Sequence, residues 1–369
     1  MAEFTKLSYE KGGLNQALAG FFKKLLEQNV FDAVMLPSGQ PTRGVMQTLI
    51  SRPEKLEAID PFAPVVPLNA AKLVSALTAT PSGRPVAVVL RSCEVRALIE
   101  LCKLKQADLD DVVIFGIDCL GRFENNDFLK FQGKGGTTEG FLSGENGGFE
   151  IAGACKMCPH PVAENVDARL CVIGCGNAVW VEWLTERGKA VCGKLGEKTG
   201  AGPDKRDKEV EALKKTRTEE REKKLAGFRD ATRDFQALQA HLAGCINCYN
   251  CRVACPVCYC KECVFVTDTF RHEGSQFMGW ADKRGALKMP TDSLFYHLTR
   301  LTHMSTLCVG CGQCTSACPN DIELAPLFCA VAEKTQARFD YLAGRSPDEE
   351  QPLATFHDDE LVEVTGQVK

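Results

Sequence analysis

The 369-residue sequence has no excess of positive charge. Its 44 Lys and Arg residues are outnumbered by 48 Asp and Glu residues, which gives a formal net charge of -4 and an isoelectric point near 6.0. Proteins that hold nucleic acid usually present a basic field to it. We therefore expect no nucleic-acid partner.

Long apolar runs are missing as well. No stretch contains the roughly eighteen uncharged apolar residues that a membrane span needs. The first residues, MAEFTKLSYEKGG, lack the apolar segment of a secretory signal peptide. We therefore expect a cytoplasmic protein with no membrane span. The sequence also contains neither a Walker A motif nor a G-x-G-x-x-G fingerprint, the two common phosphate-binding patterns.

Cysteine, by contrast, is abundant, with 20 residues. In a secreted protein so many cysteines indicate disulfides. In a reducing cytosol they indicate metal ligands, because thiols there stay available as thiolates. The spacing of the cysteines decides between these interpretations.

Two cysteine runs carry the strongest pattern. The first is Cys245-x2-Cys248-x2-Cys251-x3-Cys255-Pro256, and the second is Cys308-x2-Cys311-x2-Cys314-x3-Cys318-Pro319. In this pattern the first three cysteines of a run wrap one [4Fe–4S] cluster, and the fourth crosses to the other cluster. We therefore predict one cluster on Cys245, Cys248, Cys251 and Cys318, and a second on Cys308, Cys311, Cys314 and Cys255.

The alternative metal is zinc, which favours paired Cys-x2-Cys knuckles with four ligands per site. Two complete C-x2-C-x2-C-x3-C-P runs depart from that pattern, so we favour iron–sulfur clusters. Three more thiols follow the first run directly, Cys258, Cys260 and Cys263, and no fourth ligand is evident for them. A further metal, a minor redox role and simple packing all stay open for these three.

The N-terminal part predicts an α/β domain with a mostly parallel sheet. Apolar periodicity indicates helices at residues 14–29, 70–77 and 94–105. Buried strands are expected at residues 31–37, 85–90, 111–117 and 167–174. Alternation of strands and helices at short spacing is typical of βαβ units. Residues 120–150 are rich in Gly, Asn and Thr, and we expect a loop or a short hairpin there.

Charged side chains dominate residues 195–230 and predict a solvated helical linker. We therefore expect four segments: the α/β domain at 1–195, the linker at 196–238, a mainly helical module with two [4Fe–4S] clusters and an insertion at 239–335, and a C-terminal tail at 336–369. A helix before the second cysteine run should place Leu294, Phe295, Leu298, Leu301 and Met304 on one face. Thr291 or Asp292 is a candidate cap for its start.

Further cysteines follow the strands of the α/β domain. Cys93 and Cys119 come just after two adjacent predicted strands, at the edge where open α/β sheets bind ligands. Cys155-x2-Cys158 adds a knuckle, and Cys175 is a reserve ligand. Cys93, Cys119, Cys155 and Cys158 are candidates for a third [4Fe–4S] site, with ordinary core packing as the alternative. Core packing is the favoured role for Cys102, Cys171 and Cys192.

These segments resemble the beta subunits of coenzyme F420-dependent formate dehydrogenases and, more distantly, those of F420-reducing hydrogenases. The family's Pro–Cys–acidic–x–Arg–Ala–Leu motif corresponds to SCEVRAL at residues 92–98. Its Gly–x–Asn–Cys–Gly–Gly motif is matched in part by GIDCLG at 116–121, and its Cys–Gly–Asn by residues 175–177. The most similar stretches are CPVCYCKEC, the second cysteine run and FDYLAGRSPDEEQPL.

The resemblance implies a third cluster on Cys93, Cys119, Cys155 and Cys158, and FAD bound to the domain of residues 1–195. The flavin would exchange a hydride with F420 or NAD(P)H and single electrons with the clusters. Two loops are our candidates for flavin contacts. One holds Ser38, Gly39 and Arg43, and the other holds Gly133, Gly135 and Gly136, whose backbone N–H groups are suited to phosphate. Plain surface turns are the alternative for both loops.

The function that these features indicate is an electron-transfer subunit of an anaerobic oxidoreductase complex. It would pass electrons between a hydride carrier at FAD and a catalytic partner through [4Fe–4S] clusters. The expected partners are a formate dehydrogenase or hydrogenase catalytic subunit, heterodisulfide-reductase-like subunits, or both. The sequence has no molybdopterin-binding domain, so the formate or hydrogen chemistry would lie on the partner. The alternative is a flavin-free iron–sulfur adapter that connects two larger redox enzymes.

Overall fold

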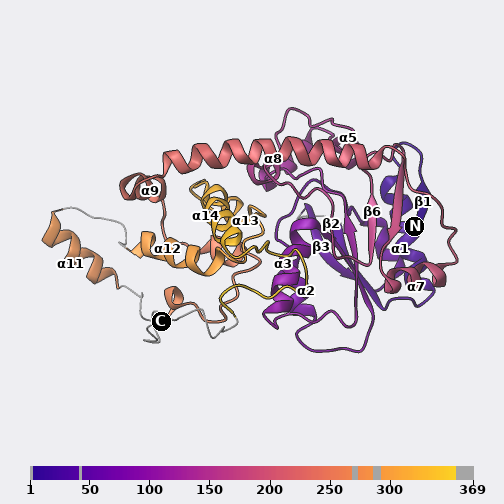
Figure 1. Cartoon of the computed structure of the whole chain (residues 1–369), viewed down its shortest axis with the longest axis horizontal. Helices are drawn as coiled ribbons and strands as arrows, with labels where there is room; N and C mark the ends of the chain where they lie inside the picture. Colours follow the sequence, from indigo (N-terminus) through magenta and orange to yellow (C-terminus); the bar gives the residue numbers. More distant parts are fainter. Residues whose placement is uncertain (1–2, 41–43, 268–272, 286–291, 355–369) are drawn as a thin grey trace, which may run out of the picture.

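The computed structural model describes residues 3–40, 44–267, 273–285 and 292–354. Within these residues, seven strands form one sheet in the order β1-β7-β6-β5-β4-β2-β3 (Figure 1). They are β1 (Glu3–Ser8), β2 (Ala33–Gln40), β3 (Gly44–Ile50), β4 (Val86–Arg91), β5 (Val112–Ile117), β6 (Ala168–Cys171) and β7 (Ala178–Trp183). The central strands β2, β4, β5 and β6 run parallel, and the other three pair antiparallel. The predicted α/β fold class is confirmed.

Both faces of the sheet are covered, because alternate strand residues point to opposite sides. On one face lie α1 (Leu14–Glu27) and α7 (Glu186–Leu195). Two phenylalanines of α1, Phe21 and Phe22, pack edge-on against Phe115 of β5, with ring centroids 6.0 and 5.7 Å apart. On the other face lie α2 (Ala71–Leu77) and α3 (Ser92–Lys103), and the core there continues into the cysteine-rich part of the chain. One face of the sheet is thus covered by α1 and α7, and the core on the other face extends to the cysteine-rich part of the chain.

Two stretches differ from the expectation. The chain does not turn at Ser38, because β2 continues to Gln40 and pairs with β3 as an antiparallel hairpin. Residues 120–150 hold two short helices, α4 (Asn125–Gly133) and α5 (Thr138–Leu142), in place of a loop or hairpin. A small separate core fixes them, and its aromatic members are Phe123, Phe128, Phe131 and Phe141. The sequence pattern also did not indicate β1, β3 or β7.

The charged segment is the helix α8 (Arg206–Ala231), which runs from the sheet to the cysteine-rich module along one side of the molecule (Figure 1). Its first residue, Arg206, is buried and forms a bidentate ion pair with Asp118 just after β5. Further along, Arg221 and Arg229 both pair with Glu333. The expected helix is thus present in this segment, and five of its side chains are buried against the rest of the molecule: Arg206, Val210, Arg217, Leu225 and Phe228.

The module beyond α8 is mainly helical, as expected. Its helices are α9 (Phe235–Leu242), α10 (Asn250–Ala254), η2 (Val264–Val266), α11 (Gly274–Arg284), α12 (Asp292–Met304), α13 (Gln313–Ser316) and α14 (Leu324–Arg338), and the short helices η1 (Pro53–Ala58) and α6 (Gly153–Lys156) lie outside the module. Arg43, the side chain of Asp292 and Thr291 lie outside the described residues. Every helix in the described ranges is too short or too polar to cross a bilayer.

The described part of the C-terminal tail packs against α3. The buried carboxylate of Glu100 accepts hydrogen bonds from the hydroxyl of Tyr341 at 2.6 Å and from the backbone N–H of Gly344 at 2.7 Å. The side-chain amide of Gln351 donates to it as well, at 2.9 Å. These bonds tie the tail to the helix that carries Cys93 at its start.

Candidate metal centres

The two cysteine runs fold into equivalent turns. In each run the residue before the second cysteine and the residue after it have left-handed backbone. They are Asn247 and Tyr249 in the first run, with φ of 52° and 59°, and Gly310 and Gly312 in the second, with φ of 72° and 76°. Left-handed residues tighten a turn. Here they aim the backbone N–H groups of Asn247 and Gly310 at the sulfur of the first cysteine in each run.

One cavity, called the outer cavity here, is lined by Cys245, Cys248, Cys251 and Cys318. The first three come from the first run and the fourth from the end of the second run. Cys248 is exposed, so this cavity lies close to the surface. Two residues of α12, Tyr296 and His297, complete its wall. The four cysteines are the set that the spacing predicts for one cluster.

A second cavity, the inner cavity, is lined by Cys255, Cys308, Cys311 and Cys314. This set also crosses between the runs as predicted. Burial raises the pKa of the Cys255, Cys311 and Cys314 thiols, and the neighbouring sulfurs raise it further. Crowded free thiols resist ionisation, whereas iron ligation removes their protons and supplies positive charge. The donor set therefore fits an iron–sulfur cluster.

A single zinc ion does not suit this arrangement. In the part of the chain that the structure describes, no three His, Cys, Asp or Glu side chains are gathered tightly enough to hold one metal ion. Thiolates around one zinc all lie about 2.3 Å from it. The thiolates of a cubane bind separate iron atoms, so they stand further apart, around a cavity.

The four cysteines of the sheet-edge group, Cys93, Cys119, Cys155 and Cys158, also influence one another. Burial raises the pKa of the Cys93 thiol, Glu94 raises it further, and the sulfurs of Cys311, Cys119 and Cys158 add to this. Burial raises the pKa of Cys155 to about 11, with Arg122 opposing and Cys119 and Cys158 reinforcing the change. Gly312, the neighbour of Cys311, lies against Ala154, the neighbour of Cys155, which puts this group beside the inner cavity.

Local capping holds Cys93 at the sheet edge. The carboxylate of Glu94 accepts the backbone N–H of Arg91 at 2.8 Å and that of Ala70 at 3.0 Å. This fixes the first turn of α3, where Cys93 lies. Cys119 follows β5, the neighbour of β4, and Nη1 of Arg91 donates to its sulfur at 3.3 Å. Both cysteines therefore lie at the carboxyl edge of the parallel strands, as the sequence predicts.

Buried arginines lie between the sulfur groups. Arg122 donates to Ser316 Oγ at 2.5 Å. Burial lowers the pKa of its guanidinium, but the sulfurs of Cys155 and Cys311 and the Glu124 carboxylate raise it above its ordinary value. Arg96 donates to the carbonyl oxygens of Ala343 at 3.0 Å and Val309 at 3.2 Å. These cations offset the negative charge that neighbouring clusters would bring.

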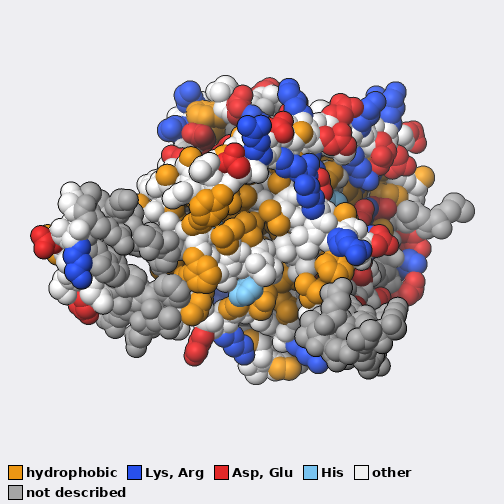
Figure 2. All heavy atoms as spheres, turned by 60° about the vertical axis from the view of Figure 1, so that its left-hand side comes forward, with side chains coloured by type: hydrophobic (Ala, Val, Ile, Leu, Met, Phe, Trp, Pro, Cys, Tyr) orange, Lys and Arg blue, Asp and Glu red, His pale blue; other side chains and the backbone are white. Residues whose placement is uncertain are grey.

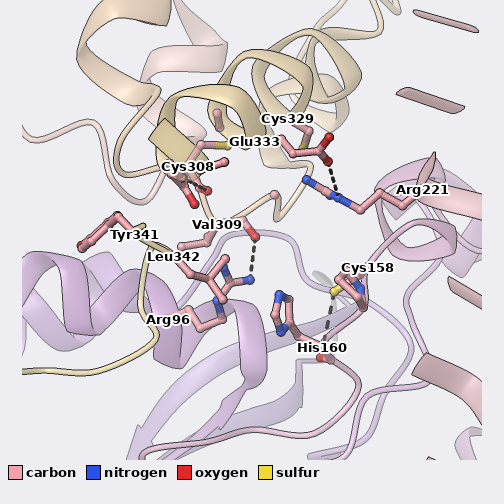
Figure 3. A pocket seen from close by; sticks show the side chains of 15 residues that line it. Arg96, Cys158, His160, Arg221, Cys308, Val309, Cys329, Glu333, Tyr341 and Leu342 are labelled. Atoms are coloured by element: carbon pink, nitrogen blue, oxygen red, sulfur yellow. Dashed lines mark hydrogen bonds and ion pairs between the residues drawn. The ribbon is translucent and has the colours of Figure 1, made fainter. Parts of the chain in front are cut away.

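A cavity of about 260 Å³ opens between the sheet-edge group and the inner cavity (Figure 3). Cys158 and Cys308 lie on its wall, and Arg96 and His160 point into it. Burial, with a smaller effect of three nearby cations, lowers the pKa of His160 to about 3, so the imidazole is neutral at pH 7. The cavity thus has one cysteine of each group on its wall.

The remaining cysteines lie elsewhere. Cys175, the reserve ligand, is near Asp118 and Arg206, and its sulfur lies 3.3 Å from the carbonyl oxygen of Ile173. Cys171 and Cys192 are buried in the core as expected, and Cys102 packs half-buried beside it. Cys260 Sγ lies 3.8 Å from His303 Nδ1, and Cys258 lines a separate cavity.

Five of the six residues proposed for flavin contacts lie in described segments, and Arg43 does not. Ser38 and Gly39 lie within β2, and the hydroxyl of Ser38 donates to the carbonyl of Ala58 at 3.2 Å. Gly133 ends α4. The backbone N–H groups of Gly135 and Gly136 donate to carbonyls of that helix at 2.9 Å, so the turn uses them itself. These residues do not fit a phosphate cradle.

Comparison with known proteins identifies the cysteine-rich module. Residues 241–322 match the family described as the 4Fe-4S dicluster domain, and this range holds both cysteine runs. The module is a 4Fe-4S dicluster domain. The structure agrees with this match, because each of two cavities is lined by four cysteines drawn from both runs.

The whole chain is similar to two curated relatives. It is 28% identical to "F420-dependent formate dehydrogenase subunit beta" of Methanocaldococcus jannaschii, with 89% of this chain and 91% of the relative covered. It is 25% identical to "F420-dependent formate dehydrogenase 1 subunit beta" of Methanococcus maripaludis, with 94% of both covered. The resemblance that the motifs predict is confirmed, and the relatives are subunits of an oxidoreductase.

A solved structure offers a more distant likeness. It is the xenon-derivatised F420-reducing [NiFe] hydrogenase complex from Methanosarcina barkeri. The match has a TM-score of 0.47 and 13% sequence identity, and it covers 64% of this chain and 94% of that one.

Several residues that lie beside the cluster cysteines are not part of the two cysteine motifs, so the motifs do not predict them. Tyr296, His297 and Arg300 approach the outer cavity from α12, and Cys329 of α14 lines the inner cavity. The first three stand at positions i, i+1 and i+4 of α12, whose sequence DSLFYHLTRLTHM mixes apolar and polar residues. That spacing puts Tyr296 and Arg300 one turn apart and is the sequence signal that points to them.

Proposed function

We propose that this chain is an electron-transfer subunit of an oxidoreductase complex and carries three [4Fe–4S] clusters. Cys245, Cys248, Cys251 and Cys318 would hold the outer cluster, and Cys255, Cys308, Cys311 and Cys314 the inner cluster. Cys93, Cys119, Cys155 and Cys158 would hold the third. The observation that carries the proposal is the pair of cavities, each lined by one crossed set of four cysteines. The clusters would supply one-electron transfer.

The three clusters would form a linear path with the inner cluster in the middle. Two contacts support this order. Gly312 of the second cysteine run packs against Ala154, the neighbour of Cys155, which joins the inner cavity to the sheet-edge group. Arg300 lies between the inner and outer cavities, since its guanidinium faces Cys251 and influences Cys255 and Cys314. Electrons would enter and leave at the two ends of this path.

The outer cluster would face the protein partner. Cys248 is exposed there, and so are several apolar side chains of the same module: Ile246, Val253, Phe295 and Leu298. The face that includes this end of the molecule gathers hydrophobic side chains below a band of charged ones (Figure 2). By the names of its relatives, the partner we propose is a formate dehydrogenase catalytic subunit. Heterodisulfide-reductase-like subunits are a second kind of partner.

The other end of the path would meet a hydride carrier. The relatives are named as F420-dependent, and F420 delivers two electrons as a hydride. Each cluster accepts one electron at a time, so a group such as FAD is needed to convert the two-electron hydride into single electrons. A second function is a flavin-free adapter between two redox enzymes, and it is favoured by one observation: the backbone N–H groups of Gly135 and Gly136 already donate within their own turn.

One preparation separates the two functions. The chain is produced anaerobically with its catalytic partner, and flavin is sought after acid denaturation. Reduced F420 and NADH are then added in turn while bleaching of the cluster absorbance is followed. Released flavin together with bleaching by one carrier supports the hydride-linked function. Intact clusters, no flavin after reconstitution and no bleaching by either carrier support the adapter. A preparation without clusters overturns both.

A further inference from the structure

Helix α12 turns its polar side inward. Tyr296, His297 and Arg300 are 1%, 1% and 4% exposed, whereas Phe295 and Leu298 of the same helix are 56% and 40% exposed. An ordinary amphipathic helix would bury the apolar pair. Burying three polar side chains costs free energy unless each finds a partner. Their partners therefore explain why the helix packs this way.

The partners are the sulfurs of the outer cavity. Nη1 of Arg300 lies 3.2 Å from Cys251 Sγ, and the hydroxyl of Tyr296 lies 3.4 Å from the same sulfur. Nε2 of His297 lies 3.3 Å from Cys245 Sγ. One helix thus presents three side chains to two of the four cysteines.

The direction of these hydrogen bonds follows from the chemistry of the sulfur. A cysteine bound to iron is a thiolate and has no hydrogen to give, so it only accepts. Guanidinium always donates, and the hydroxyl of Tyr296 turns its hydrogen toward the thiolate. His297 must carry its ring hydrogen on Nε2. Its other nitrogen, Nδ1, is buried without a hydrogen-bond partner among the described residues, which leaves Nε2 as the functional atom.

The sulfurs of the inner cavity have different side-chain hydrogen bonds from those of the outer cavity. As a free thiol, Cys308 donates to the sulfur of Cys329, which raises the pKa of Cys308 and lowers that of Cys329. A Cys308 thiolate bound to iron could only accept from Cys329, and a thiol is a weak donor. Arg300 also lines the inner cavity, but the sulfur to which it donates is that of Cys251 in the outer set, and it acts on Cys255 and Cys314 through its charge. The guanidinium is held in place from the sides, since its Cζ lies 4.6 Å from the ring of Phe328 and Nη2 donates to the Cys251 carbonyl.

We propose that Tyr296, His297 and Arg300 are positioning residues that set the reduction potential of the outer cluster above that of the inner cluster. Donated hydrogen bonds and a fixed positive charge stabilise the reduced cluster, which carries one more negative charge than the oxidised one. The step is a one-electron transfer in which the inner cluster is oxidised and the outer cluster is reduced, with no bond made or broken. Electrons thus collect at the end of the path with the exposed cysteine. This inference rests on the proposed function, because it requires both clusters.

The test is an EPR-monitored redox titration of the anaerobic full-length protein, after its iron content has been measured. Tyr296→Phe removes one donor and keeps the ring, and Arg300→Met removes the charge and keeps most of the stem. Each variant is expected to make the higher-potential cluster about tenfold harder to reduce at a fixed potential, a downward shift of about 59 mV for one electron. The lower-potential cluster should shift less. Tyr341→Phe is the matched control, because its buried hydroxyl bonds Glu100 and no sulfur.

Two outcomes overturn the inference. In the first, Tyr296→Phe keeps all its clusters and both potentials stay within the range of Tyr341→Phe. In the second, the lower-potential cluster is the one that shifts. Tyr296→Phe alone decides the matter should Arg300→Met fail to fold. Wild-type protein without iron would overturn the proposed function itself, so the two failures are distinguishable.

Discussion

Gly312, between the second and third cysteines of the second run, lies directly against Ala154, the residue before Cys155. A side chain at position 312 would overlap the methyl group of Ala154, and the backbone of Gly312 is left-handed, with φ of 76°. This contact joins two parts of the chain that the sequence separates by more than a hundred residues. It brings the sheet-edge group next to the inner cavity.

Gly312→Ala should therefore destabilise the protein and disturb the coupling between two clusters. Left-handed backbone costs alanine about 1–2 kcal/mol, and overpacking adds about 1–3 kcal/mol. Gly196→Ala is the matched control, since Gly196 is also left-handed but has open space around it. The measurements are the thermal midpoint and the magnetic interaction between clusters in EPR spectra. Equal effects of the two substitutions would contradict the close contact.

Cys158→Ser should remove the third cluster and leave the dicluster domain intact. The expected iron content falls from about twelve to about eight atoms per chain, since each [4Fe–4S] cluster holds four. Cys175→Ser is the control, because the groups that act on Cys175 are Asp118, Arg206 and Glu209 and no cysteine of the sheet-edge group, so this variant should keep the full iron content. Loss of iron in the Cys175 variant and not in the Cys158 variant would mean that Cys175, and not Cys158, is the ligand of the third cluster.

If each cluster takes ligands from both cysteine runs, substitutions in different runs should affect the same cluster. Cys318→Ser should weaken the same EPR signal as Cys245→Ser, although Cys318 belongs to the second run. Cys255→Ser should weaken the other signal, together with Cys308→Ser. A Cys318 variant that loses the signal of Cys308 would show that each run holds its own cluster.

The ion pair between Arg206 and Asp118 should contribute strongly to stability. Both side chains are buried, and Arg206→Met leaves the carboxylate without its charged partner. Breaking a buried pair in this way costs about 3–5 kcal/mol. Lys224→Met breaks an exposed pair with Glu323 and should cost less than about 1 kcal/mol. Thermal unfolding of the two variants compares them, and similar midpoints would mean that α8 is not anchored at the sheet.

The cysteines could be predicted from the sequence because a cubane imposes their spacing. Cys245 to Cys255 and Cys308 to Cys318 carry that geometry in the chain itself. The packing of α12 could not be predicted the same way. Apolar periodicity placed Phe295 and Leu298 on the buried side with Leu301 and Met304, yet only Leu301 and Met304 of these four are buried. Tyr296, His297 and Arg300 are buried because they contact the sulfurs of Cys245 and Cys251. Hydrophobic periodicity cannot predict contacts between polar side chains and sulfur.

Short-range composition also misled at residues 120–150. Glycine and asparagine suggested a loop, but Phe123, Phe131 and Phe141 gather across the segment and stabilise two helices by burial. Contacts of this kind form only once the chain is folded. The parallel pairing of β4 and β5, by contrast, followed from the alternation of strands and helices, and it placed Cys93 and Cys119 at one edge of the sheet.

The most direct test of the account is Mössbauer spectroscopy of the anaerobic, ⁵⁷Fe-enriched protein together with metal analysis. We expect about twelve iron atoms per chain, all in [4Fe–4S] clusters, and no stoichiometric zinc. A folded protein with native activity whose cysteines hold zinc, or no metal at all, would contradict it.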